Sequence, residues 1–315
     1  MALQAVESVV SLLILIGVGW WLAGRPWFGA AGASLFSKYT VNVAVPCFMF
    51  YNMVDVCGSR ETLFHLLAGV PFPAFIVCCN FALGLLLARL LRVAPQRKGV
   101  FLNVITFSNV VFVGLPVVSA LFGEQGLPYA MIYYLANTLF FWSAGVWLLR
   151  RYGGKTSGGS LAQALRGIFS PPIIGMLLGV AAVLLGVQVP AFLYRPITML
   201  KNTATPIAML FIGSVIRSTK AGAVKCTHEL AAVLAVRFVL SPLLVAALTL
   251  LLPMQPIMRQ VFVLLSAMPA MTQLGVMAKE SGSDYSFAAL LITLTTAVSM
   301  AIIPLYMLLI ERFLV

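Results

Sequence analysis

The stretch NVVFVGLPVVSALFG (Asn109–Gly123) has the composition of a membrane-buried helix, yet it carries Gly114, Leu115 and Pro116 in its middle. Glycine and proline are the weakest helix formers. In the hydrocarbon core of a membrane there is no water to bond a backbone N–H or C=O that a broken helix leaves unpaired, and each such group costs several kcal/mol. A lone proline predicts only a kink. A break with a function is predicted if other spans are interrupted in the same way.

The composition of the whole chain is that of a membrane protein. Of its 315 residues, 62% are hydrophobic and 9% are charged, and the mean hydropathy is +1.05, which excludes a water-soluble globular domain. Apolar segments of about 20 residues, long enough to cross a bilayer core, recur along the chain. They lie at about 2–24, 33–54, 62–88, 99–122, 127–149, 169–188, 192–216, 229–252, 257–278 and 285–310. We predict an all-α polytopic membrane protein with ten transmembrane helices and short connections.

The positive charges predict the orientation of these helices. The first segment lacks the features of a signal peptide, so we take it as a retained helix. If its N-terminus lies outside, the inside connections hold most of the 20 Lys and Arg residues, among them Arg97, Lys98 and Arg150. The positive-inside rule then places both termini outside a plasma (inner) membrane. The net charge of +12 is therefore explained by topology, and we predict no nucleic-acid partner.

Residues for covalent or metal chemistry are few. Five cysteines, two histidines and eight acidic residues are scattered along the chain, without a disulfide framework, metal-ligand spacing or intramembrane carboxylate pair. No HExxH or GxSxG motif occurs. We predict that the chain is not an enzyme and holds no metal or cofactor.

Two interruptions recur in both halves of the chain. The second and seventh spans contain Asn42–Pro46 and Asn202–Pro206, which both read NxAxP. The fourth span breaks at Gly114–Pro116, and the ninth breaks at Ala267–Ala270. Matching interruptions at corresponding helices predict two related halves.

The halves are predicted to be inverted with respect to each other. Each holds five spans, and because five is odd the second half must enter the membrane from the opposite side. We predict two inverted five-helix repeats at about 1–151 and 165–315, joined by a short cytoplasmic linker at 152–164. Discontinuous helices at matching positions of such repeats indicate a substrate site near the midplane of the membrane.

The two broken helices, the fourth and the ninth, are expected to cross at this site. Helix N-termini after Pro116 and Pro269 would offer N–H groups and about +0.5 charge each, which favours a carboxylate or another anion. Nearby polar residues, and Arg237 in the eighth span, complete the predicted set. The predicted substrate-binding residues are Ser108, Asn109, Gly114, Pro116, Asn137, Pro269, Thr272, Gln273 and Arg237.

Other roles remain open for several of these residues. A buried Asn, Ser, Thr or Gln can instead form an ordinary interhelical hydrogen bond, and Asn80 and Asn103 are weaker candidates for that reason. Arg237 can act as a countercharge for the substrate, or its long side chain can extend to the membrane surface. For Lys201, nearer its interface, extension to the surface is the expected role.

The motifs, taken in order, resemble those of the auxin efflux carrier family over the whole chain. Ser108-Asn109, Val113–Pro116 and Leu121–Gly123 resemble the fourth helix of that family; Asn202–Gly213 resembles its seventh; Ser266–Ala270, Ala278, Asp284 and Thr295–Pro304 resemble its last two. The family includes plant PIN auxin exporters and bacterial carriers for malonate and malate. The long cytoplasmic loop of plant PIN proteins is missing here, so their phosphorylation-based regulation is not carried over, and the short chain favours a bacterial relative.

The resemblance implies a ten-helix, inverted-repeat crossover fold like that of bile-acid symporters. It also implies a scaffold of helices 1, 2, 6 and 7, a mobile domain of helices 3–5 and 8–10, elevator-type alternating access and a homodimer in the lipid bilayer. The predicted function is secondary active or potential-driven transport of a small organic anion, a mono- or dicarboxylate. Two alternatives stay open: a proton-coupled carrier of an amphipathic weak acid, and a membrane ligand sensor that does not transport.

The acidic residues also predict how transport is driven. A sodium site needs hard oxygen ligands, usually with a carboxylate among them. Glu124 and Glu280 lie well beyond Pro116 and Pro269 in the sequence, towards the predicted ends of their spans. We therefore predict transport that does not require sodium, with Glu7 or His65 as the candidates for any proton relay.

Overall fold

A computed structural model describes residues 2–55, 58–154, 168–218, 227–252 and 254–313. In these ranges nearly every residue is helical and no strand occurs, apart from one isolated antiparallel bridge between Ser108 and Ala270. The all-α prediction is thereby confirmed for the described part of the chain. Most of the predicted linker at 152–164 lies outside the described residues.

The helices have the lengths and composition of a multi-pass membrane protein. Five helical runs in the described ranges are long and apolar enough to cross a bilayer: Arg60–Leu90, Val110–Gly153, Ala191–Arg217, His228–Leu251 and Tyr285–Tyr306. Three apolar helices, Val10–Leu22, Pro171–Leu185 and Pro256–Ser266, are shorter. The arrangement as ten spans in two inverted repeats stays a prediction.

The chain forms two compact units, and each is assembled from three separate segments. Unit 1 consists of Met1–Val70, Val111–Ile132 and Phe169–Thr219. Unit 2 consists of Pro71–Val110, Tyr133–Ile168 and Lys220–Val315. Each unit therefore draws residues from both predicted repeats.

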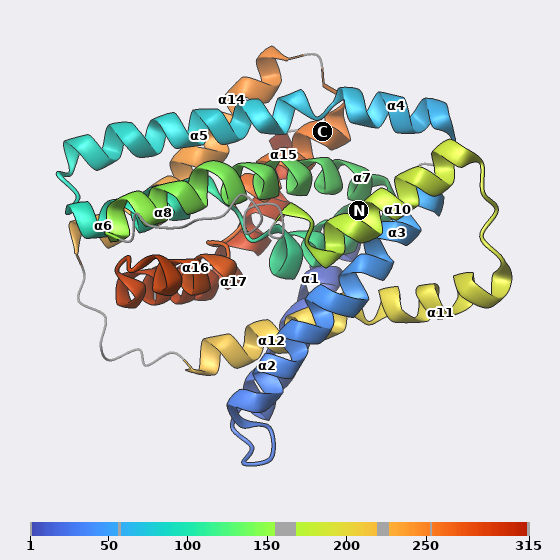
Figure 1. Cartoon of the computed structure of the whole chain (residues 1–315), viewed down its shortest axis with the longest axis horizontal. Helices are drawn as coiled ribbons and strands as arrows, with labels where there is room; N and C mark the ends of the chain where they lie inside the picture. Colours follow the sequence, from blue (N-terminus) through green and yellow to red (C-terminus); the bar gives the residue numbers. More distant parts are fainter. Residues whose placement is uncertain (1, 56–57, 155–167, 219–226, 253, 314–315) are drawn as a thin grey trace. The chain divides into compact units, whose positions relative to one another are not determined.

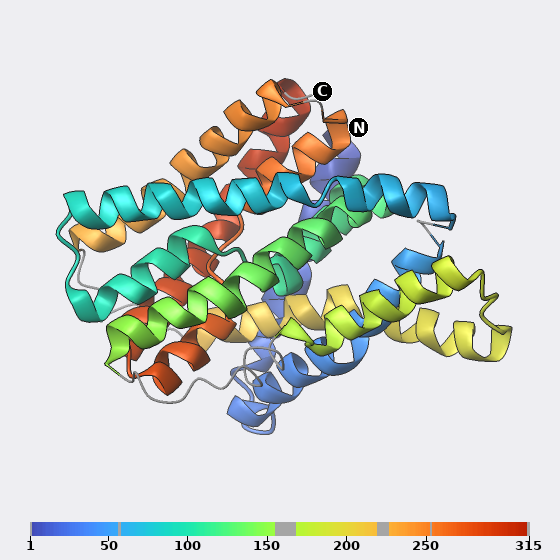
Figure 2. The same cartoon turned by 45° about the horizontal axis from the view of Figure 1, so that its top comes forward.

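Unit 1 is built from two closely packed helix pairs with shorter helices around them. Its elements are α1 (Ala2–Leu22), α2 (Gly29–Tyr39), η1 (Thr40–Ala44), α3 (Val45–Asp55), α4 (Arg60–Ala68), most of η2 (Val110–Gly114), the first part of α7 (Leu115–Phe140), α10 (Pro171–Leu185), α11 (Ala191–Asn202) and α12 (Ala204–Ser218). Figures 1 and 2 show α10 beside α3, and α1 packs in the same way on α12.

Glycines bring the backbones of these pairs into contact. A Cβ atom added to Gly19 would overlap the backbone of Leu210, and one added to Gly213 would overlap that of Ile16. In the other pair, a Cβ atom on Gly175 would overlap the backbone of Pro46. Small residues at helix contacts are typical of membrane proteins, in which association depends on close packing rather than on the hydrophobic effect.

In unit 2, the other helices pack around a central buried helix, α6. Its elements are α5 (Pro71–Leu90), α6 (Pro95–Thr106), the rest of α7, η3 (Phe141–Gly145), α8 (Val146–Gly153), α13 (His228–Ala235), η5 (Val236–Leu240), α14 (Ser241–Leu251), α15 (Pro256–Ser266), α16 (Gln273–Ser281) and α17 (Tyr285–Phe313). Every residue of α6 from Gly99 to Thr106 is buried. Helices α5, α8, α13, α16 and α17 all contact it, and Figure 1 shows α5 and α8 alongside.

An ion-pair cluster ties three elements of unit 2 together at one end of α6. Arg97 donates from Nη1 to Glu229 at 2.8 Å and from Nε to Asp284 at 3.0 Å. Asp284 and Glu229 raise the pKa of Arg97 above its ordinary value, because both carboxylates stabilise the charged guanidinium. Asp284 also accepts a hydrogen bond from the backbone N–H of Phe287 and thereby caps the start of α17.

Three of the π-helical segments end just before a proline. η1 precedes Pro46, η2 precedes Pro116 and η5 precedes Pro242, each by two residues. A proline inside an α-helix clashes with the carbonyl four residues earlier and cannot donate to it. The wider π turn moves that carbonyl away, so the helix continues through the proline.

Candidate functional site

Two breaks between helices meet in unit 2, at a place here called the crossing. One break, Phe107–Asn109, separates α6 from η2, and the other, Ala267–Thr272, separates α15 from α16. Within the crossing, Ser108 pairs with Ala270 in the antiparallel bridge, and the N–H of Asn109 donates to the carbonyl of Pro269 at 2.8 Å. Each break therefore supplies backbone partners for the other.

One of the two breaks lies where it was predicted, and the other does not. The ninth-span break at Ala267–Ala270 is confirmed. The predicted break at Gly114–Pro116 is wrong, because Gly114 ends η2 and Pro116 lies in the first turn of α7. The π turn absorbs the proline, and the non-helical residues lie earlier in the chain, at Phe107–Asn109.

Side chains from two other helices bond the unwound backbone. Asn137 of α7 is fully buried; its Oδ1 accepts from the N–H of Ser108 at 3.0 Å, and its Nδ2 donates to the carbonyl of Ser108 at 3.2 Å. In α17, Thr295 accepts from the N–H of Ala270 at 3.1 Å. Asn137 was a predicted site residue, whereas this role of Thr295 was not predicted.

Arg237 lies in η5 and is 0% exposed. Its Nε donates to the carbonyl of Met268 at 2.6 Å, Nη1 donates to the carbonyl of Ile105 at 2.9 Å, and Nη2 donates to Ser108 Oγ at 2.6 Å. The guanidinium is therefore held in the crossing and does not extend to the membrane surface. Among the described residues, no carboxylate pairs with it. The sequence carries no sign of these partners, because most are backbone carbonyls.

Asn109 and Thr272 join the two breaks through their side chains. Asn109 Nδ2 donates to Thr272 Oγ1 at 2.9 Å. Thr272 and Gln273 are partly exposed, and Gln273 begins α16. Of the predicted residues, Ser108, Asn109, Asn137, Arg237, Pro269, Thr272 and Gln273 thus lie in or beside one crossing, within one unit.

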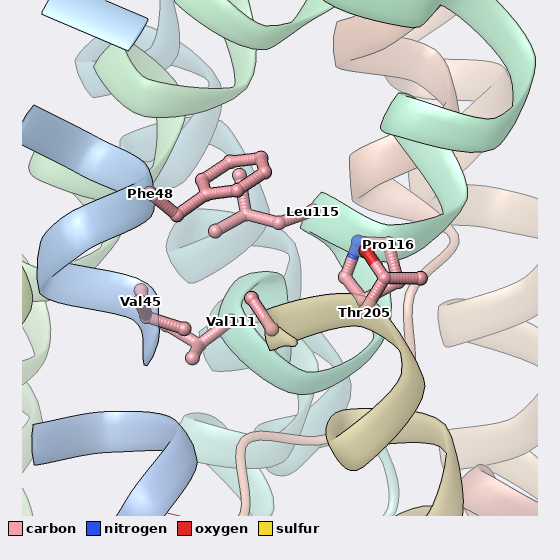
Figure 3. A pocket seen from close by; sticks show the side chains of 7 residues that line it. Val45, Phe48, Val111, Leu115, Pro116 and Thr205 are labelled. Carbon is pink, nitrogen blue, oxygen red and sulfur yellow. The ribbon is translucent and has the colours of Figure 1, made fainter. Parts of the chain in front are cut away.

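Pro116, by contrast, lines a small apolar pocket in unit 1. The lining residues are Val45, Phe48, Val111, Leu115, Pro116, Ala204 and Thr205. Figure 3 shows Thr205 beside Pro116, with Val45 and Phe48 across the pocket. Its open volume of about 10 Å³ leaves room for roughly one water molecule. With a single hydroxyl and no charge in its lining, this pocket is not suited to an anion.

Four other polar residues named from the sequence have partners or lie at the surface, whereas Asn80 is buried and no described residue bonds its Oδ1. Asn103 donates to the carbonyls of Gly99 and Gly145, and so joins α6 to η3. Lys201 lies 3.2 Å from the centre of the Tyr51 ring and 3.6 Å from Glu124. Glu7 and His65 are exposed. In the described ranges no three His, Cys, Asp or Glu side chains gather to hold a metal ion.

Comparisons with known proteins place the chain in a family. A family model described as "Membrane transport protein" matches residues 4–159 and 160–307. An uncharacterized transporter of Methanothermobacter thermautotrophicus is 27% identical in an alignment of 312 positions, which covers 95% of this chain and 96% of the relative. An uncharacterized transporter of Methanocaldococcus jannaschii is 24% identical over 95% of this chain and 97% of its own length.

A third relative has a substrate in its name. The "Putative malonate transporter" of Rhizobium meliloti is 28% identical in an alignment of 273 positions, which covers 84% of this chain and 83% of that protein. Because the family model matches nearly the whole chain, the protein belongs to the membrane transport protein family, the auxin efflux carrier-like family that its motifs resemble.

Proposed function

We propose that this transporter carries a small organic anion, a mono- or dicarboxylate, and binds it at the crossing of the two broken helices in unit 2. The observation that carries the proposal is the crossing itself, in which Asn109 and Thr272 meet beside the start of α16. Amide and hydroxyl donors at a helix N-terminus, with its partial positive charge, favour a carboxylate. Secondary carriers with discontinuous helices use such ends for anionic substrates.

The contacts of the crossing support the proposed inverted repeat. Exchanging the fourth with the ninth span, and the fifth with the tenth, exchanges Ser108 with Ala270 and Asn137 with Thr295. In both cases a side chain of the later span bonds the unwound backbone of the earlier one. The same exchange of halves converts the α1–α12 contact into the α10–α3 contact, and glycines mediate both.

The division of the chain supports elevator-type alternating access. Unit 1 holds the predicted spans 1, 2, 6 and 7, unit 2 holds most of spans 3, 5 and 8–10, and the fourth span divides evenly between the two units after Val110. Apart from the second half of the fourth span, this division matches the scaffold and the mobile domain that the resemblance implies. Because the residues of both breaks, Phe107–Asn109 and Ala267–Thr272, lie in unit 2, that unit can carry a bound anion together with these groups.

Two observations favour a short carboxylate as the substrate: the name of one relative and the small number of polar side chains at the crossing. The Rhizobium meliloti protein is named for malonate, a dicarboxylate of three carbons. The polar side chains at the crossing are few, which suits a small anion with one or two carboxylates. We therefore place malonate and other short carboxylates first among the candidates.

A thermal-shift screen of the purified protein tests this function. Short mono- and dicarboxylates are compared with neutral amides of the same size, for example malonate with malonamide. We expect at least one carboxylate to raise the melting temperature in a saturable way while its amide does not, and Gln273→Ala to weaken the effect. If every carboxylate behaves like its amide, the proposed function is wrong.

A further inference from the structure

The side chain of Arg237 fills the place between the carboxyl ends of two half-helices. Ile105 belongs to the last turn of α6, and Met268 follows the end of α15. The guanidinium bonds both of their carbonyls and reaches that of Pro269 at 3.4 Å. It is therefore surrounded by the oxygen atoms that the two breaks leave without helical partners.

The charges at this place balance. A helix carboxyl end carries about −0.5 charge, so two such ends amount to about −1, which one guanidinium neutralises. An arginine buried in a membrane protein normally pairs with an acidic side chain or with carbonyls. Here the partners are carbonyls and the hydroxyl of Ser108, and no carboxylate of the described residues takes part.

In ion-coupled carriers with broken helices, unwound carbonyls and half-helix carboxyl ends bind the coupling cation. We propose that Arg237 is a permanent internal cation in that position: it neutralises the two carboxyl ends in every state of the transport cycle, so that the anion binds without a co-bound metal cation. This inference rests on the proposed function. It assigns Arg237 as a positioning residue. Arg237 neutralises the negative helix ends beside the site and does not touch the substrate.

The position of Arg237 in its helix supports this assignment. It lies in the π-helical segment η5, the only part of the α13–α14 run that departs from α-helical geometry. An arginine that served only to anchor the helix at a membrane surface would be exposed at its tip, whereas Arg237 is 0% exposed.

Chemical rescue of an arginine deletion tests the proposal. In Arg237→Ala the carbonyl cradle loses its cation, and guanidinium ion, or sodium, can enter the space. We expect guanidinium chloride at low concentration to raise the melting temperature of Arg237→Ala in a saturable way, with choline chloride at equal ionic strength as the reference. Wild type and Arg195→Ala, which removes an exposed arginine from α11, should show no such stabilisation.

Malonate binding supplies the second readout. Wild type should bind malonate equally in sodium and in choline buffers. Arg237→Met, neutral and of similar length, should bind it about tenfold more weakly or worse, as expected when a charged hydrogen-bonding group is lost. Arg237→Lys, which keeps the charge, should retain more affinity than Arg237→Met, and it serves as the test if the alanine variant does not fold.

The outcomes separate this inference from the proposed function. If wild type needs sodium to bind malonate, if Arg237→Met binds as tightly as wild type, or if guanidinium ion does not stabilise Arg237→Ala, then Arg237 is not an internal cation. If wild type binds no carboxylate while guanidinium ion still stabilises Arg237→Ala, the cation role holds and the proposed substrate class fails.

Discussion

At the scale of single residues, the crossing is held by side chains that replace lost helical hydrogen bonds. Asn137 uses both ends of its amide on the N–H and C=O of Ser108, as a neighbouring peptide group would. The hydroxyl oxygen of Thr295 accepts a hydrogen bond from the backbone N–H of Ala270. Because these side chains bond the backbone, removing one of them should first lower the stability of the protein. Substrate binding should change only as far as the backbone of the break then moves.

Asn137→Ala should therefore destabilise the protein. The substitution leaves two buried backbone groups unpaired, at about 1–3 kcal/mol each. We expect a clearly lower melting temperature in detergent. Ser143→Ala is the control, because Ser143 is an exposed residue that bonds only carbonyls of its own helix. Equal melting temperatures for the two variants would contradict the role given to Asn137.

The Asn109–Thr272 contact predicts coupling between these two residues. We expect Asn109→Ala and Thr272→Val each to weaken carboxylate binding by about 1–3 kcal/mol. Because each single change also breaks the same hydrogen bond, the double variant should lose at least about 0.5 kcal/mol less than the sum of the two. The measurement is a double-mutant cycle of dissociation constants. Strict additivity would mean that the two side chains act separately.

At the scale of helical elements, the two prolines of the broken spans have different surroundings. Pro269 lies in the crossing, and its carbonyl accepts from the N–H of Asn109. Pro116 lies in α7, after the π turn, against the apolar pocket of unit 1. Only the first of these positions determines where a helix stops.

Pro269→Ala should therefore impair substrate binding more than Pro116→Ala does. Alanine at 269 restores an N–H and lets α15 extend into the break, which moves the carbonyls and the Asn109 contact. We expect a loss of carboxylate affinity of about tenfold, against a change within about threefold for Pro116→Ala, where no contact of the crossing is altered. Comparable losses in both variants would show that Pro116 belongs to the site after all.

The glycines of α1 provide a second test at this scale. A Cβ atom at Gly19 meets the backbone of Leu210, whereas one at Gly17 has nothing within 4 Å. Gly19→Ala should destabilise the protein by about 1–3 kcal/mol, the usual cost of overpacking, while Gly17→Ala should be neutral or slightly stabilising. The measurement is the melting temperature of each variant, and the two substitutions lie on the same helix. A neutral Gly19→Ala would exclude close packing of α1 on α12.

Particular residues show how far the sequence could predict these elements. Pro269 identified the ninth-span break correctly, although a proline alone does not stop a helix, because Pro304 lies inside α17. Pro116 misplaced the fourth-span break because the helix continues from the π-helical segment η2 through this proline into α7. What unwinds Phe107–Asn109 is a set of long-range partners, Asn137, Arg237 and Pro269. Local propensity contains no information about such partners.

At the scale of the whole molecule, the crossing, the charge of Arg237 and the family membership combine into one account. The protein is a membrane transporter by family. The homodimer and the outside location of both termini stay predictions. If an anion binds without a metal cation, its movement carries net charge across the membrane. Each unit charge is worth about 2.3 kcal/mol per 100 mV, so a potential of that size balances roughly a fiftyfold gradient of a monovalent anion.

Transport in proteoliposomes under imposed potassium-diffusion potentials tests this account most directly. The vesicles hold a radiolabelled carboxylate that the thermal-shift screen identifies, in choline buffer free of sodium at fixed pH. We predict efflux that needs no sodium and that becomes faster when the vesicle interior is made negative. Efflux that occurs only with sodium, or whose rate does not change with the potential, would contradict the account.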